Sequence, residues 1–170
     1  MKKIITIVFC IVFASTASLA QKGAAASKAD PTKGVRNAFD RLVEGIKQAD
    51  AEKVMSSYEK SPNLLIFNNN GTATKGWDDI NTVTREVYAK LSNVTLDITG
   101  LNIQMLSKTS AFVTCKWVQT QENNGKLENA AGRMTLVYKL IGKDWKIVHR
   151  HTSPDKPDAA RPVFPSERQP

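Results

Sequence analysis

The chain has 170 residues, of which 24 are Lys or Arg and 16 are Asp or Glu, so its net charge at neutral pH is +8. The basic residues are scattered, and they form no run interleaved with aromatic residues of the kind that binds single-stranded nucleic acid. The composition therefore speaks against nucleic-acid binding. We attribute the charge to solubility and to a preference for anionic ligands.

The first 20 residues have the pattern of a secretory signal peptide. Lys2 and Lys3 form a short basic region, the apolar run 4–13 is too short to span a bilayer, and the small residues Ser18 and Ala20 precede the expected cleavage site. Removal of these 20 of 170 residues would leave 150, enough for one domain with its own core. We therefore predict an exported protein, periplasmic or secreted and of bacterial origin, that has no membrane association after cleavage.

The composition of the remaining chain divides it into three segments. Residues 21–31 are rich in Ala, Lys, Ser and Gly, which predicts a flexible leader. We predict that residues 32–154 form the folded domain. Residues 155–170 are rich in proline, which predicts a disordered tail. Cleavage would leave Cys115 as the single cysteine, so the domain would have no internal disulfide. Cys115 lies in an apolar strand pattern, which favours a buried, unreactive thiol.

Helices are predicted in the first half of the folded domain. Asp30 and Pro31 indicate the start of a helix that carries apolar residues at helical spacing up to Ile46, and Asp50 indicates the cap of a second helix over 51–58. A short strand at 64–67, a turn at 68–71 and a return at 72–75 follow. A third helix is predicted from Trp77 to Leu91.

The second half is predicted to be almost entirely strand. Apolar residues alternate in one phase up to Ile98 and in the other phase from Leu101, and such a flip requires a bulge or a sharp bend near Gly100. Further strands are predicted over 111–121, 127–141 and 145–153, joined by turns at 122–125 and 142–144. The order predicts an α+β fold, with a strongly bent antiparallel sheet and three helices that form a cone-shaped half-barrel with a pocket.

The chain resembles a known superfamily in this order of elements and in its closing motif. The segment from Gly132 to Ser153, which ends in Trp-Lys-Ile-Val-His-Arg-His-Thr-Ser, is similar to the SnoaL-like branch of the nuclear transport factor 2-like superfamily, and especially to the association domain of calcium/calmodulin-dependent protein kinase II. The resemblance implies a cystatin-like roll that dimerises through its sheet. It also implies a pocket lined by arginines, whose positions fall on Arg133, Lys116 and Thr152, with Arg150 beside the last of these.

The candidate site residues lie in these strands and near the pocket mouth. Predicted ligand-binding residues are Arg133, Arg150, Lys116, Tyr58 and Trp77. His149 and His151, the two histidines, lie two apart on one strand and are candidates for acid–base catalysis or for places at a subunit interface. A metal site would need a third ligand that the spacing does not supply, so we predict no metal and no cofactor.

Three functions remain open from the sequence. The first is a homodimer, favoured by strands that are apolar on both faces, that holds a small organic or carboxylate ligand. The second is a lyase or isomerase of polyketide-cyclase type with a pocket histidine as base. The segment 62–76 contains no Asp or Glu, which removes the carboxylate base that isomerase chemistry needs, so we lean towards a protein without catalysis. The third is an oligomerisation module without a ligand.

Overall fold

The computed structural model describes residues 30–156, so the predicted signal peptide (1–20), nearly all of the predicted leader and residues 157–170 of the predicted tail lie outside the described residues. None of the described helices is long and apolar enough to cross a membrane. The elements follow in the order α1 (Lys33–Lys47), α2 (Ala51–Ser56), β1 (Leu65–Phe67), β2 (Ala73–Lys75), α3 (Trp77–Tyr88), β3 (Leu91–Met105), β4 (Ser110–Asn123), β5 (Lys126–Ile141) and β6 (Asp144–Pro154).

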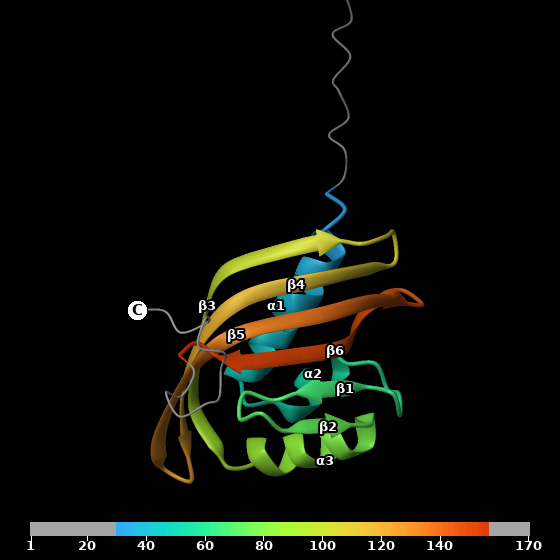
Figure 1. Ribbon diagram of the computed structural model, residues 1–170. Helices are drawn as coiled ribbons and strands as arrows, with labels where there is room; N and C mark the ends of the chain where they lie inside the picture. The colour runs from blue at the N-terminus through green and yellow to red at the C-terminus, as the bar shows by residue number, and fades with distance from the viewer. Residues whose placement is uncertain (1–29, 157–170) are drawn as a thin grey trace, which may run out of the picture.

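One six-stranded sheet, in the order β2-β1-β6-β5-β4-β3, organises the domain. The sheet is strongly curved and does not close, and α1 lies within its curve (Figure 1), where it contacts β3 and β6. We call the face towards the helices the concave face and the opposite face the convex face. This architecture confirms the predicted α+β fold. The sheet departs from the antiparallel expectation at one place, because β1 pairs with β6 in parallel.

Each of the three described helices departs from its predicted bounds at one end, and α2 ends at Ser56 instead of residue 58. The Asp30 carboxylate accepts hydrogen bonds from the Thr32 amide and hydroxyl at 2.8 and 2.7 Å, so Thr32 precedes the helix and α1 begins at Lys33. In contrast, Asp50 caps α2 as predicted by accepting from the Lys53 amide at 2.9 Å. Helix α3 ends at Tyr88, because Leu91 already pairs with Asn123 in the sheet.

The hydrophobic core lies between α1, α2 and the concave face. Alternate residues of β5 point into it, and Leu136 and Tyr138 are completely buried there. Helix α1 contributes Val35, Phe39 and Leu42 from its apolar side. This packing confirms the two periodicities of the sequence, three to four residues in the helix and two in the strands.

Two bulges shape the domain, in addition to a register shift between Ser92 and Thr95 near the start of β3. The first lies at Gly100, where φ is +60° and the register with β4 shifts between Thr99 and Asn102, as the phase flip predicts. The second lies at Val148 in β6, because Tyr138 pairs with Ile147 while the adjacent Val137 pairs with His149. The sequence analysis treated β6 as a regular strand and did not predict the second bulge.

Candidate ligand-binding site

A small cavity lies between helices α2 and α3 and the β1–β2 end of the concave face. Its volume is about 220 Å³, and we call it the inner chamber. Its wall is mostly apolar, with Val54 and Met55 from α2, Ile80 and Val83 from α3, and Ile66 from β1. The amphipathic spacing of the two helices brings these side chains together above the sheet.

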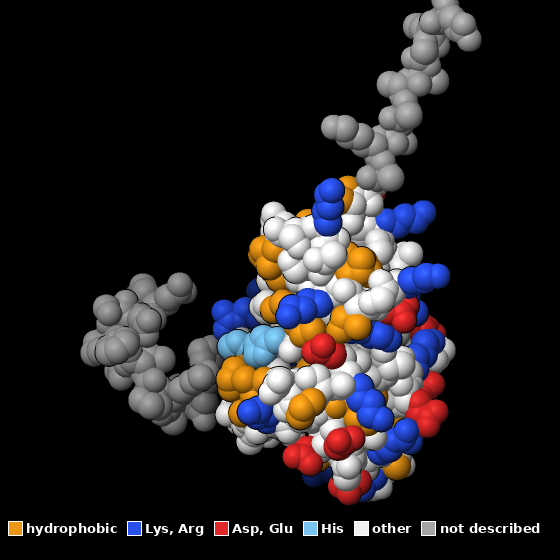
Figure 2. Space-filling view, turned by 90° about the vertical axis from the view of Figure 1, so that its right-hand side faces the viewer, with side chains coloured by type: hydrophobic (Ala, Val, Ile, Leu, Met, Phe, Trp, Pro, Cys, Tyr) orange, Lys and Arg blue, Asp and Glu red, His pale blue; other side chains and the backbone are white. Residues whose placement is uncertain are grey.

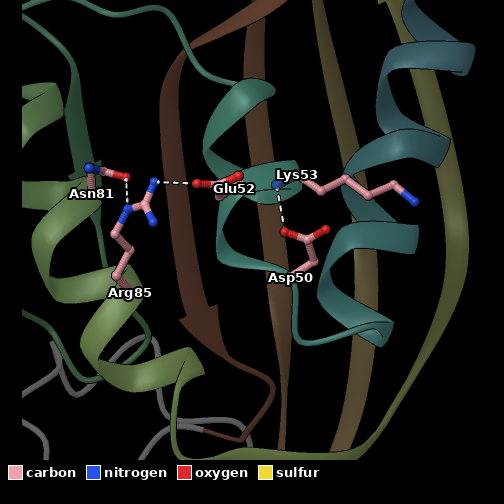
Figure 3. A network of polar contacts seen from close by, with 5 residues as sticks. All are labelled: Asp50, Glu52, Lys53, Asn81 and Arg85. Carbon is pink, nitrogen blue, oxygen red and sulfur yellow. Dashed lines mark hydrogen bonds and ion pairs between the residues drawn. The ribbon is translucent and has the colours of Figure 1, made fainter.

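One exposed polar network ties α3 to α2 beside the inner chamber (Figure 3). Arg85 of α3 donates to the Glu52 carboxylate of α2 at 2.9 Å, and its Nε donates to Asn81 at 3.3 Å. Both members of the ion pair are more than half exposed, so the pair adds at most about 1 kcal/mol to stability. Apolar contact, rather than this ion pair, holds the chamber wall in place.

A wider space adjoins the inner chamber, and we call it the outer cleft. Its volume is about 660 Å³. Its wall combines the loop Asn68–Asn70, Trp117 and polar side chains of β4 and β5 with five aliphatic side chains, those of Ile46, Val87, Leu91, Leu96 and Met134. Gly132 of β5 lies close to two residues of this wall, because a Cβ atom there would come within 2.8 Å of Cζ2 of Trp117 and 3.0 Å of Oδ1 of Asn69. Four residues line both spaces: Asn68, Val87, Tyr88 and Arg150.

Arg150 reaches the shared wall of the two spaces because of the Val148 bulge. In a regular strand, residues three apart point to opposite faces. The extra residue places Ile147 and Arg150 on the same concave face, where they stand opposite Tyr138 and Leu136. The same bulge turns His149 and His151 to the convex face.

Neutral groups hold the Arg150 side chain. Nη1 donates to the Tyr58 hydroxyl at 3.2 Å and Nη2 to Oδ1 of Asn68 at 2.8 Å. The Asn68 amide nitrogen donates in turn to the Thr72 and Thr74 hydroxyls at 3.1 and 3.3 Å, which fixes its oxygen towards the guanidinium. None of the ion pairs within residues 30–156 involves Arg150.

The electrostatics of this wall favour an anion. A guanidinium carries five N–H donors, and the two hydrogen bonds leave others for a ligand. Burial raises the pKa of Tyr88 well above its usual value, with a further rise from Tyr58 and an opposing effect of Arg150. The Tyr88 phenol therefore stays protonated at neutral pH. The wall combines one permanent cation with neutral phenols.

Comparison with models of known protein families identifies the family of this domain. The family model described as a SnoaL-like domain matches residues 35–156. The chain belongs to the SnoaL-like domain family. A search among curated proteins finds no match.

Solved structures show the same fold. A nuclear transport factor 2 (NTF2-like) superfamily protein from Salmonella enterica superposes with a TM-score of 0.67 at 23% identity, over 78% of this chain and 97% of that one. A ketosteroid isomerase-like protein from Erwinia carotovora gives 0.63 at 18% identity, over 76% and 99%. A Xanthomonas campestris protein provisionally named as a calcium/calmodulin dependent protein kinase II association domain gives 0.61 at 19%, over 85% and 97%. These likenesses confirm the NTF2-like fold, which is consistent with ligand binding and with isomerase- or dehydratase-type chemistry.

The predicted ligand-binding residues of this SnoaL-like domain separate into two groups. Arg150 and Tyr58 line the inner chamber. Lys116 and Arg133 pair with each other across β4 and β5 on the convex face, where Lys116 contacts the Asp155 carboxylate at 3.3 Å and Arg133 donates to the Pro154 carbonyl at 3.3 Å. Both are exposed, and the strand parity that buries Met134 turns them away from the cavities.

Trp77 lies at the start of α3 and is not part of either cavity wall. The Lys60 ammonium stands 4.9 Å from the centre of its ring, in cation–π geometry. The ring packs against the edge of the core and is half-buried. The structure therefore places Trp77 beside the core and away from Arg150.

The two histidines lie on the convex face, next to Phe67. Nδ1 of His149 is 2.9 Å from the Leu65 carbonyl oxygen, and both imidazole rings meet the Phe67 ring edge-on with centroids 5.7 Å apart. Figure 2 shows the histidine side chains at the surface beside basic and hydrophobic ones. Residues 30–156 contain no group of three side chains that could hold a metal ion.

The polar part of the outer cleft wall was not predicted from the sequence. Gln119 donates to Gln121 at 2.6 Å, and Gln121 and Asn123 donate to the Glu128 carboxylate at 2.9 and 3.2 Å. Among the described residues that line the two cavities, Glu128 is the one carboxylate, and it is exposed. Alternating Gln residues in β4 were the available signal, since residues two apart share a face.

Proposed function

We propose that this SnoaL-like protein binds a small organic anion, of the carboxylate class, through Arg150. The observation that supports the proposal is a half-buried guanidinium, at the junction of two cavities, that has only neutral partners within residues 30–156. Removing a cation from water without an opposite charge is costly. A bound carboxylate would supply that charge and the bidentate geometry that guanidinium favours.

The residues around Arg150 favour binding over catalysis. A general base must lie within hydrogen-bond reach of the proton that it removes. The two histidines of the polyketide-cyclase alternative lie on the convex face, and Glu128 is held by two amides at the exposed end of the outer cleft. We therefore favour a carrier or sensor of the ligand over a lyase or isomerase.

Thermal unfolding with carboxylate salts tests the proposal. Sodium acetate and sodium benzoate are compared with sodium chloride at equal ionic strength, and a ligand that binds the folded state raises Tm. We expect at least one carboxylate to raise Tm of the wild type, and Arg150→Gln to abolish the increase. Arg133→Gln is the matched control on the convex face and should keep it. An increase that survives Arg150→Gln, or that Arg133→Gln removes, would overturn the proposal.

A second part of the proposal concerns self-association through the convex face. Phe67 and Val118 are 39% and 52% exposed on this face, which also carries half-buried Phe112 and Val137. Partly apolar, two-sided sheets favour a homodimer, and one structural neighbour is named for an association domain. Sedimentation velocity at micromolar concentration should show a dimer. A clean monomer would refute this part.

A third part concerns export. The basic start, the short apolar run 4–13 and the small residues before Gln21 support cleavage and transfer to the periplasm or the medium. Intact-mass measurement of the protein expressed in a bacterium should show a mature chain that begins at Gln21. A cytoplasmic chain that retains Met1–Ala20 would contradict it.

A further inference from the structure

The two cavities differ in size, and Arg150 lies in the wall that they share. The inner chamber holds about 220 Å³ and the outer cleft about 660 Å³. We infer that the ligand is a carboxylate with one compact apolar group, of the size of a six-membered ring, and that this group enters the inner chamber while the carboxylate stays at Arg150. This inference rests on the proposed function and adds the class of ligand.

The size of the inner chamber sets the size of the apolar group. An apolar cavity of about 150 Å³ in another protein is large enough for benzene. The inner chamber, at about 220 Å³, therefore has room for one ring with a small substituent.

Several polar atoms in the chamber wall already have partners, whereas Nε of Arg150 is buried without one within residues 30–156. The Thr84 hydroxyl donates to the Ile80 carbonyl at 2.7 Å, and the Thr74 hydroxyl accepts from Asn68 at 3.3 Å. The Tyr58 hydroxyl accepts from Arg150 at 3.2 Å. These internal hydrogen bonds leave a wall that presents mainly methyl groups and ring carbon atoms. Such a wall favours an apolar group, because a polar group would lose its hydrogen bonds with water.

The position of the charge fixes the orientation of the ligand. Arg150, Tyr88, Asn68 and Val87 form the shared wall, so a carboxylate on the guanidinium lies at the entrance of the inner chamber. The apolar group can then point inwards to Val54, Val83 and the other aliphatic side chains. The opposite orientation would put the carboxylate among those side chains, away from the guanidinium.

Isothermal titration with sodium acetate and sodium benzoate tests the inference. Both ligands carry the same anion, and only benzoate has the ring. Burial of one ring should make benzoate bind about tenfold to hundredfold more tightly than acetate.

Val83→Phe fills the chamber from its α3 wall and should remove the preference for benzoate while acetate binding stays unchanged. Val118→Phe on the convex face is the matched control, since Val83 and Val118 are 51% and 52% exposed. It should bind both ligands as the wild type does. Val83→Leu provides a milder filling if Val83→Phe does not fold, and should reduce the preference in part.

The possible outcomes separate this inference from the proposed function. Equal affinity for acetate and benzoate, both lost in Arg150→Gln, would overturn the inference and leave the carboxylate site in place. A benzoate preference that is unchanged in Val83→Phe would also overturn it, because the ring would then bind elsewhere. Absence of any binding that depends on Arg150 would overturn the proposed function itself.

Discussion

Neighbouring residues of β6 face two different environments. Arg150 lies at the wall of two cavities on the concave face, with Tyr58 and Asn68 as partners. His149 and His151, one residue to either side, lie on the convex face against Phe67. The Val148 bulge decides which of them faces the cavities. One inserted residue in a strand can thus place Arg150 on one face of the sheet and the two adjacent histidines on the other.

The two faces also differ in how their charges are solvated. The convex face carries Lys116 and Arg133, both exposed, with oxygen partners at the end of β6. Water screens such charges, so they add little to affinity for a small anion. Arg150 is half-buried, and screening there is weaker. The half-buried Arg150 should therefore dominate anion binding over the two convex cations.

The largest expected difference between the faces is in stability. Leu136 is completely buried on the concave face of β5, and Leu136→Ala should lower the free energy of unfolding by about 2 to 5 kcal/mol. The next residue, Val137, is half-buried on the convex face, and Val137→Ala should cost about 1 kcal/mol or less. Urea unfolding measures both. A Val137→Ala loss as large as that of Leu136→Ala would show that the convex face is covered.

The second prediction concerns stability at alkaline pH, which depends on two buried side chains of the concave face. Burial raises the pKa of the Cys115 thiol from 9.0 to about 11 and that of the Tyr138 phenol well above its usual value. The unfolded chain loses these protons first, so the free energy of unfolding should fall as pH rises above 9, through about 11 for the thiol. Within residues 30–156 the buried Tyr138 hydroxyl has no hydrogen-bond partner. Tyr138→Phe should thus be neutral or stabilising at pH 7, by up to about 1 kcal/mol.

Chemical unfolding at pH 7, 9, 10 and 11 measures this effect. Tyr138→Phe and Cys115→Ala should each make the decline above pH 9 less steep, whatever their stability at pH 7. Thr135→Ala on the convex face of β5 is the control and should keep the slope of the wild type. An unchanged slope in both buried variants would mean that these groups ionise equally in the folded and unfolded chains.

Much of the fold could be predicted because the patterns that define it are local. The phase flip at Thr99–Gly100 indicated the first bulge, and alternating apolar residues indicated the long strands. The end of α3 was placed three residues too late, because Leu91 continues the helical spacing but pairs with Asn123. The parallel pairing of β1 with β6 joins segments far apart in the sequence, and no local pattern reports it.

The candidate site was harder to predict because it depends on strand parity and on non-local pairing. Arg150 and Tyr58 were among the predicted residues, but Arg133 and Lys116 were grouped with them by resemblance. The apolar row that includes Met134 and Leu136 faces the helices, so Arg133 lies on the other face. Two consecutive apolar residues, Ile147 and Val148, were the one sign of the second bulge, and a short apolar pair has several interpretations.

The smallest expected effects come from the histidines, and they sharpen the comparison most directly. His151→Gln removes an exposed ring and should change the free energy of unfolding by about 0.5 kcal/mol or less. His149→Gln loses the contact with the Leu65 carbonyl and should cost about 1 kcal/mol. Neither should change the increase in Tm that we expect from carboxylates, because neither ring reaches the cavities. A histidine variant that lost this increase while Arg150→Gln kept it would reverse the assignment of the two faces, since the ligand would then bind beside Phe67.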